Sequence, residues 1–476
     1  MTDVRAVCLD CLLKIEKGEF CHLVLRNALE AHGDWDRRDR AFLTRLTEGC
    51  VEHRYELDAI LDSYSRIKTK KMKPVIRNVL RMAVYQMKYM DSVPDRAAVN
   101  EAVRLAKRRG FSSLQGFVNG VLRTVSRELP DWRAPEESEN FTEWARVVCS
   151  MPVWITEAMR GEYGEARTAA MLRESMSGRP LTVRFNLSRA SEEAILASLR
   201  SQKIHAEAVE GLTGVYRLSG YDSLSDIRAF SEGLFQVQDV SSVLAGLAAS
   251  PKAGDHVLDV CAAPGGKSLH AADLLKGTGL VEARDLSDEK TDLIRDNIRR
   301  SRFENITAKT QDALIFDPEK EGWADILIAD LPCSGLGIIG RKSDIKYHIT
   351  PEGQTELAAL QRRILDTIWR YVKPGGRLVY STCTLFPSEN RENAEWFAKN
   401  YPFEPESLAG RIPERFFKAE AVNRNGFVME PESGNAPSDQ DGNSVGNQLQ
   451  LLPGEHGTDG FFISSFIRKR EGDDQV

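Results

Sequence analysis

From His256 onward, the sequence alternates short apolar stretches with helical segments. The candidate strands are HVLDV, GLVEAR, DILIAD and GRLVYST, and the segments between them have the length of βαβ crossovers. This alternation predicts a twisted, mainly parallel α/β sheet with helices on both faces. FFISSFIRK, near the C-terminus, predicts one more strand that rejoins the sheet, and the polar stretch 430–448 before it predicts a flexible loop.

The preceding part of the chain has a different pattern. Most of residues 1–130 carries apolar side chains at three- and four-residue spacing, and LPDWRAP ends this block. Between Arg179 and Asp239, the β-like stretches LTVRFNL, GVYRLSG and GLFQVQD surround the helical SEEAILASLRS. We therefore expect a multidomain protein: an all-α domain at 1–135, linker helices with a small α+β unit at 136–235, and a Rossmann-like α/β domain at 236–476.

Cysteine content and charge limit the class of protein. Eight cysteines in 476 residues show no disulfide-framework spacing, and Cys8 with Cys11 is at most half a zinc site, so we interpret that pair as core positions of a helix. The chain has no apolar run that would span a membrane and no secretory leader pattern, and we expect a cytoplasmic protein. The net charge is −6, yet residues 61–130 have about ten more Lys and Arg than acids, which favours a polyanionic partner.

A glycine-rich turn follows the first strand of the α/β domain. In CAAPGGKSLH (261–270), paired glycines let the backbone approach a ligand and present N–H groups at a helix start. Three acids, Asp285, Asp312 and Asp330, follow or end successive candidate strands. A single acid there is usually a helix cap, but three beside a glycine turn predict a nucleoside-type ligand crevice.

Two cysteines lie just beyond strand ends. Cys333 is in DLPCSG and Cys383 is in STCT, and a free cysteine is usually a small core residue. Here both fall on the ligand side of the predicted sheet. A thiolate that adds to carbon 6 of cytosine makes carbon 5 nucleophilic, and an acid at N3 stabilises the developing charge. Two cysteines and Asp330 supply this set of groups, although the residues alone do not tell which cysteine is the nucleophile.

Several motifs together resemble those of a known family. They are GLFQVQDVSS, DVCAAPGGKSLH, DLPCSGLG, STCTLFPSENREN and GTDGFF. These five motifs closely resemble those of the RNA 5-methylcytosine methyltransferases. RNVLRMAVYQM, VPDRAAVNEAVRLAK and FVNGVLR are similar to the NusB-type RNA-binding helical domain. The combination resembles the bacterial 16S rRNA cytosine-5 methyltransferase B (Sun/Fmu) subfamily, which implies a class I methyltransferase fold and S-adenosylmethionine as cofactor.

The resemblance implies a role for each matching residue. Cys383, in the TC motif, would be the nucleophile, Cys333, in the PC motif, would assist adduct breakdown, and Asp330 would hold the cytosine edge near the cofactor. In the DNA enzymes of this chemistry the PC cysteine is the nucleophile, so the assignment depends on the family. The implied cofactor-binding residues are Cys261, Ala262, Ala263, Pro264, Gly265, Gly266, Lys267, Asp285, Asp312 and Asp330.

RNA would be held by basic residues. A run of charge is usually a solvated helix face, but beside an RNA-modifying domain it favours phosphate contacts. The target cytosine would have to leave its stack to reach Cys383. The candidate RNA-binding residues are Lys70, Lys71, Lys73, Arg77, Arg81, Arg108, Arg109 and Arg184.

Two alternatives stay open at this point. One is a non-catalytic RNA-binding or antitermination factor with a vestigial methyltransferase fold, which the intact Cys333, Cys383 and Asp330 disfavour. The other is a methyltransferase whose substrate is tRNA, against which only the NusB-like region weighs. The expected partner is RNA, 16S rRNA above all. We further expect a monomer without a metal ion.

Overall fold

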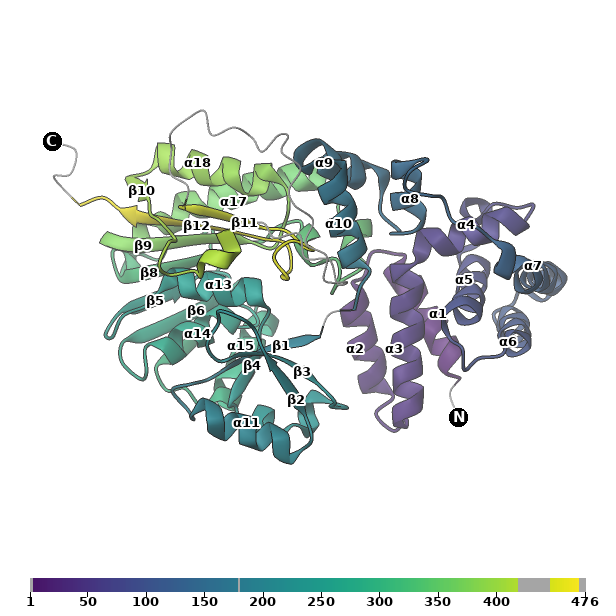
Figure 1. Ribbon diagram of the computed structural model, residues 1–476, viewed down its shortest axis with the longest axis horizontal. Helices are drawn as coiled ribbons and strands as arrows, with labels where there is room; N and C mark the ends of the chain where they lie inside the picture. Colours follow the sequence, from purple (N-terminus) through teal and green to yellow (C-terminus); the bar gives the residue numbers. More distant parts are fainter. Residues whose placement is uncertain (1–2, 179, 418–445, 471–476) are drawn as a thin grey trace. The chain divides into compact units, whose positions relative to one another are not determined.

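The computed structural model describes residues 3–178, 180–417 and 446–470, which form two compact units (Figure 1). The helical unit comprises residues 1–177 together with 339–349. The α/β unit comprises residues 178–338 and 350–476. The stretch predicted as a flexible loop, 430–448, lies almost wholly outside the described residues.

The helical unit is built from amphipathic helices around one apolar core. Leu9, Leu46, Leu57 and Val84, from four different helices, are buried in that core. Cys8 and Cys11 are buried beside them, which confirms that they are core positions. Its helices are α1 (Val4–Ile15), α2 (Cys21–Ala31), α3 (Arg37–Glu52), α4 (Arg54–Tyr64), α5 (Pro74–Tyr89), α6 (Asp95–Arg108), α7 (Gln115–Glu128), α8 (Phe141–Val147), α9 (Val153–Tyr163), α10 (Glu165–Ser175) and α16 (Ile345–His348).

Two features of this unit are not visible in the apolar periodicity of the sequence. The periodic stretch 40–64 is divided into α3 and α4 at His53, whose φ of −97° and ψ of 21° leave the helical region. Apolar spacing continues through the break, so periodicity alone does not reveal it. In addition, α8, α9 and α10 group with the helical unit rather than with the small α+β unit, because their apolar faces pack among themselves and on α4.

The first part of the α/β unit is a small antiparallel sheet in the order β2-β3-β1-β4. Val183, Phe185, Ile195, Leu199 and Phe235 are buried between this sheet and its helices. All of these strands except β2 match predicted β-like stretches. The elements are β1 (Leu181–Phe185), α11 (Glu192–Ser201), β2 (His205–Ala208), β3 (Val215–Ser219), α12 (Arg228–Ser231) and β4 (Phe235–Val237).

The second part, within the described residues, is a mixed sheet of eight strands in the order β10-β12-β9-β8-β5-β6-β7, with β11 paired to β12. The strands β7, β6, β5, β8 and β9 are parallel, as predicted, and β12 rejoins the sheet antiparallel to β9. The strands are β5 (His256–Asp259), β6 (Leu280–Asp285), β7 (Ile306–Thr310), β8 (Ala324–Asp330), β9 (Val372–Thr382), β10 (Phe403–Pro405), β11 (Gln448–Leu451) and β12 (Phe461–Arg468).

Helices cover both faces of this sheet, as Figure 1 shows. Successive strand residues point to opposite faces, so Val257 packs in one core and Leu258 in the other. The first core holds side chains of α13 (Val240–Ala249), α14 (Gly266–Leu274) and α15 (Asp288–Ser301). The second holds side chains of α17 (Pro351–Ile368) and α18 (Arg391–Asn400). This doubly covered sheet leaves the carboxyl ends of its parallel strands as the place for a site.

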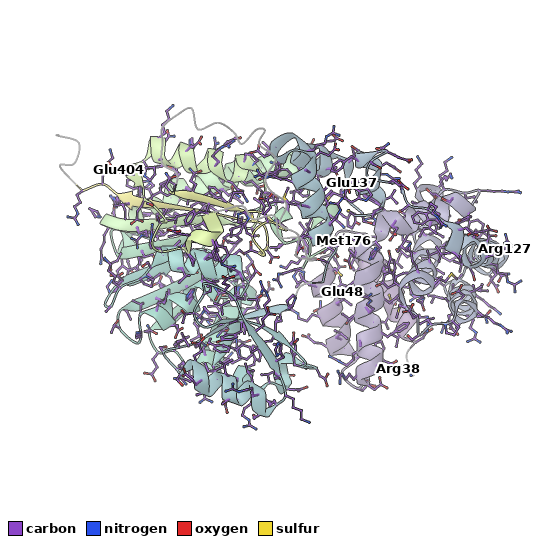
Figure 2. The ribbon with its side chains drawn as sticks, viewed as in Figure 1. Arg38, Glu48, Arg127, Glu137, Met176 and Glu404 are labelled. Atoms are coloured by element: carbon purple, nitrogen blue, oxygen red, sulfur yellow. The ribbon has the colours of Figure 1, made fainter. Side chains whose placement is uncertain are left out.

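Charged side chains cover the outside of each unit. Arg38 and Arg127 are exposed on the helical unit and Glu404 on the α/β unit (Figure 2). In the part of the chain that the structure describes, no helix is both long and apolar enough to cross a membrane.

Candidate active site

The glycine-rich turn joins β5 to α14. Gly265 has a φ of +104°, a conformation that residues with a Cβ rarely adopt, and α14 begins at the next residue. The backbone N–H of Ala262 donates to the carbonyl of Arg284 at 2.8 Å, which ties the turn to β6. The turn therefore presents its backbone at the carboxyl edge of the sheet, as the motif predicted.

Of the acids predicted at strand ends, Asp285 lies against this turn. Its Oδ2 accepts a hydrogen bond from the N–H of Ala263 at 2.9 Å, and Lys290 forms an ion pair with its Oδ1 at 3.0 Å. Asp312 follows β7, the neighbouring strand, and its Oδ1 accepts a hydrogen bond from Leu314 N–H at 2.9 Å within its own turn. Asp285 thus contacts the turn directly, whereas Asp312 accepts its hydrogen bond from a residue of its own turn.

Asp330, at the end of β8, forms an ion pair with Lys267 from the glycine-rich segment. Lys267 Nζ lies 2.6 Å from Asp330 Oδ2, and Ser381 Oγ donates to Asp330 Oδ1 at 2.7 Å. Burial lowers the pKa of Lys267, but the charge and hydrogen bond of Asp330 outweigh it and the net pKa is raised. The lysine is therefore a fixed cation at this edge, and it also lies 5.2 Å from the centre of the Phe461 ring.

The two cysteines meet at the same edge of the sheet. Cys333 follows β8 and Cys383 follows β9, and their Sγ atoms are 3.3 Å apart. The hydrogen bond with Cys383 raises the pKa of Cys333, and burial raises it further. Cys333 therefore holds its proton more firmly than an ordinary thiol does. This edge of the sheet thus brings together two thiols, an acid and a buried cation, and a thiol can act as a nucleophile in covalent catalysis.

One further acid was missed by the sequence analysis. Asp259 ends β5 and is almost completely buried, and burial raises its pKa to about 7. Its Oδ2 accepts a hydrogen bond from Ser268 Oγ at 2.6 Å, while its Oδ1 has no hydrogen-bond partner among the described residues. The signal was available, because Asp259 ends a parallel strand as Asp285 and Asp330 do.

Comparison with known proteins identifies the family. Residues 247–467 match the family model of 16S rRNA methyltransferase RsmB/F, residues 2–127 match the NusB family, and residues 151–220 match the ferredoxin-like domain of RsmF/B-like methyltransferases. The chain is 35% identical to the probable ribosomal RNA small subunit methyltransferase B of Bacillus subtilis (strain 168), over 98% of this chain and 99% of the relative. The chain belongs to the RsmB/F family. The three-part fold and the resemblance expected from the motifs are thereby confirmed.

Another curated relative and two solved structures also match large parts of this chain. The probable ribosomal RNA small subunit methyltransferase B of Synechocystis sp. is 29% identical over 94% of this chain and 95% of its own. Among solved structures, PH0851 has a TM-score of 0.75 at 22% identity and covers 99% of both chains. A methyltransferase homologue from Pyrococcus horikoshii has a TM-score of 0.55 at 24% identity and covers 70% of this chain and 100% of its own. These structures share the fold, and the protein is a methyltransferase.

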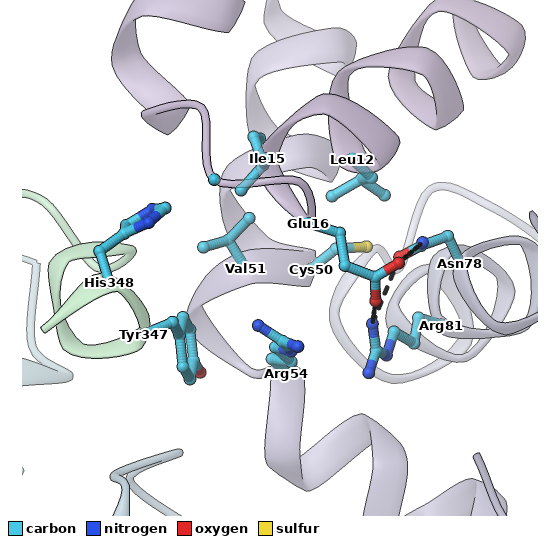
Figure 3. Close-up of a pocket in the computed structure, with 11 residues that line it drawn as sticks. Leu12, Ile15, Glu16, Cys50, Val51, Arg54, Asn78, Arg81, Tyr347 and His348 are labelled. Carbon is cyan, nitrogen blue, oxygen red and sulfur yellow. Dashed lines mark hydrogen bonds and ion pairs between the residues drawn. The ribbon is translucent and has the colours of Figure 1, made fainter. Parts of the chain in front are cut away.

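The basic residues predicted to bind RNA fall into two groups. Lys70, Lys71 and Lys73 are exposed at the turn that precedes α5. In contrast, Arg77 donates to Glu16 Oε1 at 2.7 Å, and Arg81 is buried in a bidentate pair with Asp58 and a further contact to Glu16. Figure 3 shows Glu16 with Asn78 and Arg81 at one wall of a cavity of about 180 Å³ in the helical unit.

The remaining predicted arginines also have acidic partners. Arg108 pairs with Asp3, and Arg109 pairs with Asp10 at 2.7 Å. Arg184 is buried and donates to Asp273 Oδ2 at 2.7 Å and to Asn186 Oδ1 at 2.9 Å. As placed, Arg81 and Arg184 have guanidinium groups committed to the fold, so the structural support for phosphate contacts lies with the three exposed lysines.

Proposed function

We propose that this protein methylates carbon 5 of a cytosine in 16S rRNA through a covalent adduct between Cys383 and carbon 6 of the base. The observation that carries the proposal is the meeting of Cys333 and Cys383, with Sγ atoms 3.3 Å apart, at the edge where Asp330 and Lys267 pair. The choice of RNA is supported by the relatives, whose names describe methyltransferases of small-subunit ribosomal RNA.

The cofactor is S-adenosylmethionine, and the residues of this chain fit it. Asp285 stands at the end of β6 beside the glycine turn, where a carboxylate can accept hydrogen bonds from ribose hydroxyls. Lys267 supplies a cation, and the backbone approaches closely at Gly265. When bound, the cofactor supplies an electrophilic methyl group on a sulfonium.

Cys383 is the better of the two candidate nucleophiles on electrostatic grounds. The hydrogen bond between the thiols raises the pKa of Cys333, so Cys333 keeps its proton and donates it toward Cys383. The buried cation of Lys267 interacts electrostatically with Cys383. The thiolate is the reactive form of a cysteine, and a neighbouring cation favours that form.

In the proposed reaction, the Cys383 thiolate adds to carbon 6 of the flipped cytosine. The ring electron pair moves toward carbon 5 and N3, and N3 takes up a proton that the Asp330 carboxylate holds by a hydrogen bond. Carbon 5 then bonds the transferred methyl group. A base removes the proton from carbon 5, the carbon 6–sulfur bond breaks, and Cys383 leaves as a thiolate. Cys333, in contact with that sulfur, assists this last step.

The target base has to leave its stack before Cys383 can reach it, which favours a cytosine in a loop or single strand. Lys70, Lys71 and Lys73 supply phosphate contacts on the helical unit. A reducing cytoplasm suits this chemistry, because the reactive thiol must stay reduced. We take the working protein to be a monomer.

Cysteine variants test the proposal. Cys383→Ala should abolish transfer of labelled methyl groups to small-subunit rRNA, whereas Cys333→Ala should leave RNA bound to the protein on a denaturing gel. RNA that carries 5-fluorocytosine should trap the wild-type adduct in the presence of cofactor. Carbon 5 then carries fluorine in place of the proton that must be removed before the carbon 6–sulfur bond can break. Cys149→Ala, in the buried core of the helical unit, is the matched control. Full activity of Cys383→Ala would refute the mechanism.

A further inference from the structure

Behind the two cysteines lies a buried polar cluster that the reaction itself does not use. Gln361 on α17 and the neighbours Glu389 and Asn390, just before α18, are almost fully buried. Uncharged apolar side chains would fill such a position at lower cost, because burying a carboxylate requires compensating hydrogen bonds. Each of these three side chains has at least one partner among the residues adjacent to Cys333 and Cys383.

The loop that carries Cys333 is held on both sides of the cysteine. The N–H of Ser334 donates to Glu389 Oε2 at 2.8 Å, and Ser334 Oγ donates to Glu389 Oε1 at 2.6 Å. On the other side, Gln361 Nε2 donates to the carbonyl of Pro332 at 2.8 Å. Both oxygens of the Glu389 carboxylate are therefore directed at a single residue of the loop.

The orientation of Gln361 is itself fixed. Its Oε1 accepts hydrogen bonds from Asn393 Nδ2 at 2.7 Å and from Tyr380 OH at 3.1 Å, which leaves its Nε2 to donate to the loop. The amide therefore cannot turn without losing two buried hydrogen bonds.

The loop that carries Cys383 is held in the same way by Asn390. Its Oδ1 accepts a hydrogen bond from Thr382 Oγ1, and its Nδ2 donates to the carbonyl of Thr384 at 3.0 Å. One asparagine thus contacts the residue before the cysteine and the residue after it.

The two loops are joined directly as well. Ser334 Oγ and Thr384 Oγ1 are 2.5 Å apart. Because the Ser334 hydroxyl donates to Glu389, the Thr384 hydroxyl donates to Ser334, and the hydrogen bonds run in one direction from Thr384 to the carboxylate. Each cysteine lies one residue away from this bridge.

We propose that Glu389 and Asn390 are positioning residues that hold the loops of Cys333 and Cys383 in register, so that the two sulfurs stay in contact during the reaction. This inference rests on the proposed function, since it assigns a use to that contact. Glu389 anchors the Cys333 loop and Asn390 the Cys383 loop, and the serine–threonine bridge transmits the position of one loop to the other.

The charge of Glu389 supports a role beyond packing. Among the described residues it has no ion-pair partner, and only neutral groups donate to it. After the hydrogen bond with Cys383 and burial, the charge of Glu389 contributes to raising the pKa of Cys333. Burial raises the pKa of Glu389 itself, and in its charged form the carboxylate helps Cys333 to keep its proton.

The contact between the sulfurs can be measured without catalysis. Diamide accepts two electrons and two protons from a pair of thiols and leaves a disulfide, at a rate that depends on their proximity. In the wild-type protein, mass spectrometry should find the Cys333–Cys383 disulfide. In Glu389→Ala, its formation should be about tenfold slower or more, whereas Glu389→Gln should stay within about threefold of wild type.

The glutamine variant is the conservative rescue because it can keep every contact. Its oxygen can accept from Ser334 N–H, and its amide can donate to Ser334 Oγ, whose hydroxyl then turns to Thr384. Glu392→Ala, in the first turn of α18 and exposed, is the matched control and should match wild type in every assay.

Turnover provides the second measurement. Glu389→Ala should lower kcat about tenfold or more with little change in the KM for RNA, and a larger share of RNA should stay bound on a denaturing gel. Glu389→Gln should retain kcat within about threefold, and its pH profile should shift to lower pH because the negative charge beside Cys333 is gone. Equal loss of kcat in the alanine and control variants would overturn the inference.

If Glu389→Ala does not fold, Ser334→Ala provides a milder test of the same contacts. Ser334→Ala removes the hydroxyl bridge but leaves the Ser334 N–H on Glu389, and it should slow disulfide formation by about three- to tenfold. Wild-type rates of disulfide formation and turnover in both Glu389→Ala and Ser334→Ala would overturn the inference while leaving the proposed function intact. Full activity of Cys383→Ala would instead remove the proposed function, and the disulfide rates would still report on the two loops.

Discussion

The carboxylate of Asp344 accepts a hydrogen bond from the backbone N–H of Cys21 at 2.7 Å, although 323 residues separate them in the sequence. Cys21 is the first residue of α2, whose own N-cap residue, Phe20, provides no side-chain cap. Asp344 belongs to the segment 339–349, which leaves the α/β unit shortly after Cys333 and is grouped with the helical unit. Lys346 and Tyr347 of the same segment donate to the carbonyls of Cys149 and Ser150.

Asp344→Ala should therefore loosen α2. The loss of a cap and of a negative charge at a helix N-terminus costs about 1–2 kcal/mol. Hydrogen–deuterium exchange of the full chain should show faster exchange in the first turn of α2. Asp344→Asn keeps an acceptor oxygen and should have the smaller effect; equal exchange in both variants would mean that the carboxylate does not cap this helix.

Substitutions of the two residues that contact the Asp330 carboxylate, Lys267 and Ser381, should reduce activity to different degrees. Lys267→Met removes the cation from a carboxylate at the site and should slow single-turnover methyl transfer about 30- to 150-fold, the equivalent of about 2–3 kcal/mol. Ser381→Ala removes one neutral donor from the other oxygen of Asp330 and should cost about five- to tenfold. A larger effect of the serine substitution would contradict the importance assigned to the ion pair.

Asp259 predicts a dependence of stability on pH. Its pKa is raised to about 7 by burial, from an ordinary value of 3.8, so between these values the folded state binds more protons than the unfolded state. The stability contributed by the protonated form is present below pH 4 and is lost as pH rises through 7. Between pH 5 and pH 8 the loss amounts to about 2–3 kcal/mol.

Asp259→Asn stays neutral throughout this range. Its stability relative to wild type should therefore increase from pH 5 to pH 8, as measured by urea unfolding with hydrogen exchange in β5 as the probe. A constant offset between the two proteins at both pH values would show that Asp259 does not titrate in this window.

Breaking the pair of Arg184 and Asp273 should reduce the stability of the fold rather than the affinity for RNA. The pair is buried, and Asp273 also accepts hydrogen bonds from Ser188 N–H and Ser188 Oγ. Removal of one member of a buried pair costs about 3–5 kcal/mol, so Asp273→Ala should lower the midpoint of urea unfolding strongly. Asp296→Ala, which breaks an exposed pair with Arg299, should change stability by less than about 1 kcal/mol.

Replacement of the three exposed lysines should change the salt dependence of RNA binding. Replacement of Lys70, Lys71 and Lys73 by Ala together should weaken binding at low salt and reduce the slope of log K against log salt by about two to three. Filter binding over a salt series measures this slope. The same slope in the triple variant and in wild type would place the phosphate contacts elsewhere.

Much of the site could be predicted from the sequence because it depends on strand ends. The motif cysteines and the glycine turn follow parallel strands, and Asp285 and Asp330 end such strands. Parallel strands end at one edge of the sheet, so these residues come together there. Asp259 obeyed the same rule and was missed, because it was treated as part of the strand that leads into the glycine turn.

The partners of charged residues could not be predicted in this way. Arg81 and Arg184 were predicted to contact RNA, yet their partners Glu16 and Asp273 lie 65 and 89 residues away in the sequence. Nothing in the local pattern distinguishes a guanidinium on a solvated face from one that a distant carboxylate neutralises. The segment 339–349, which carries Asp344, likewise has no local signal of the unit to which it belongs.

The sequence by itself determined the alternation of strands and helices in the α/β domain, the glycine turn and the placement of both cysteines beyond strand ends. The period of apolar residues and the chain direction are local properties, so they can be read without the tertiary structure. Only the tertiary structure decided which charged groups have acidic partners, that Glu389 and Asn390 hold the loops of the two thiols, and that Asp344 caps α2. These depend on which side chains become neighbours once the core has formed, and burial then sets their charge and hydrogen bonding.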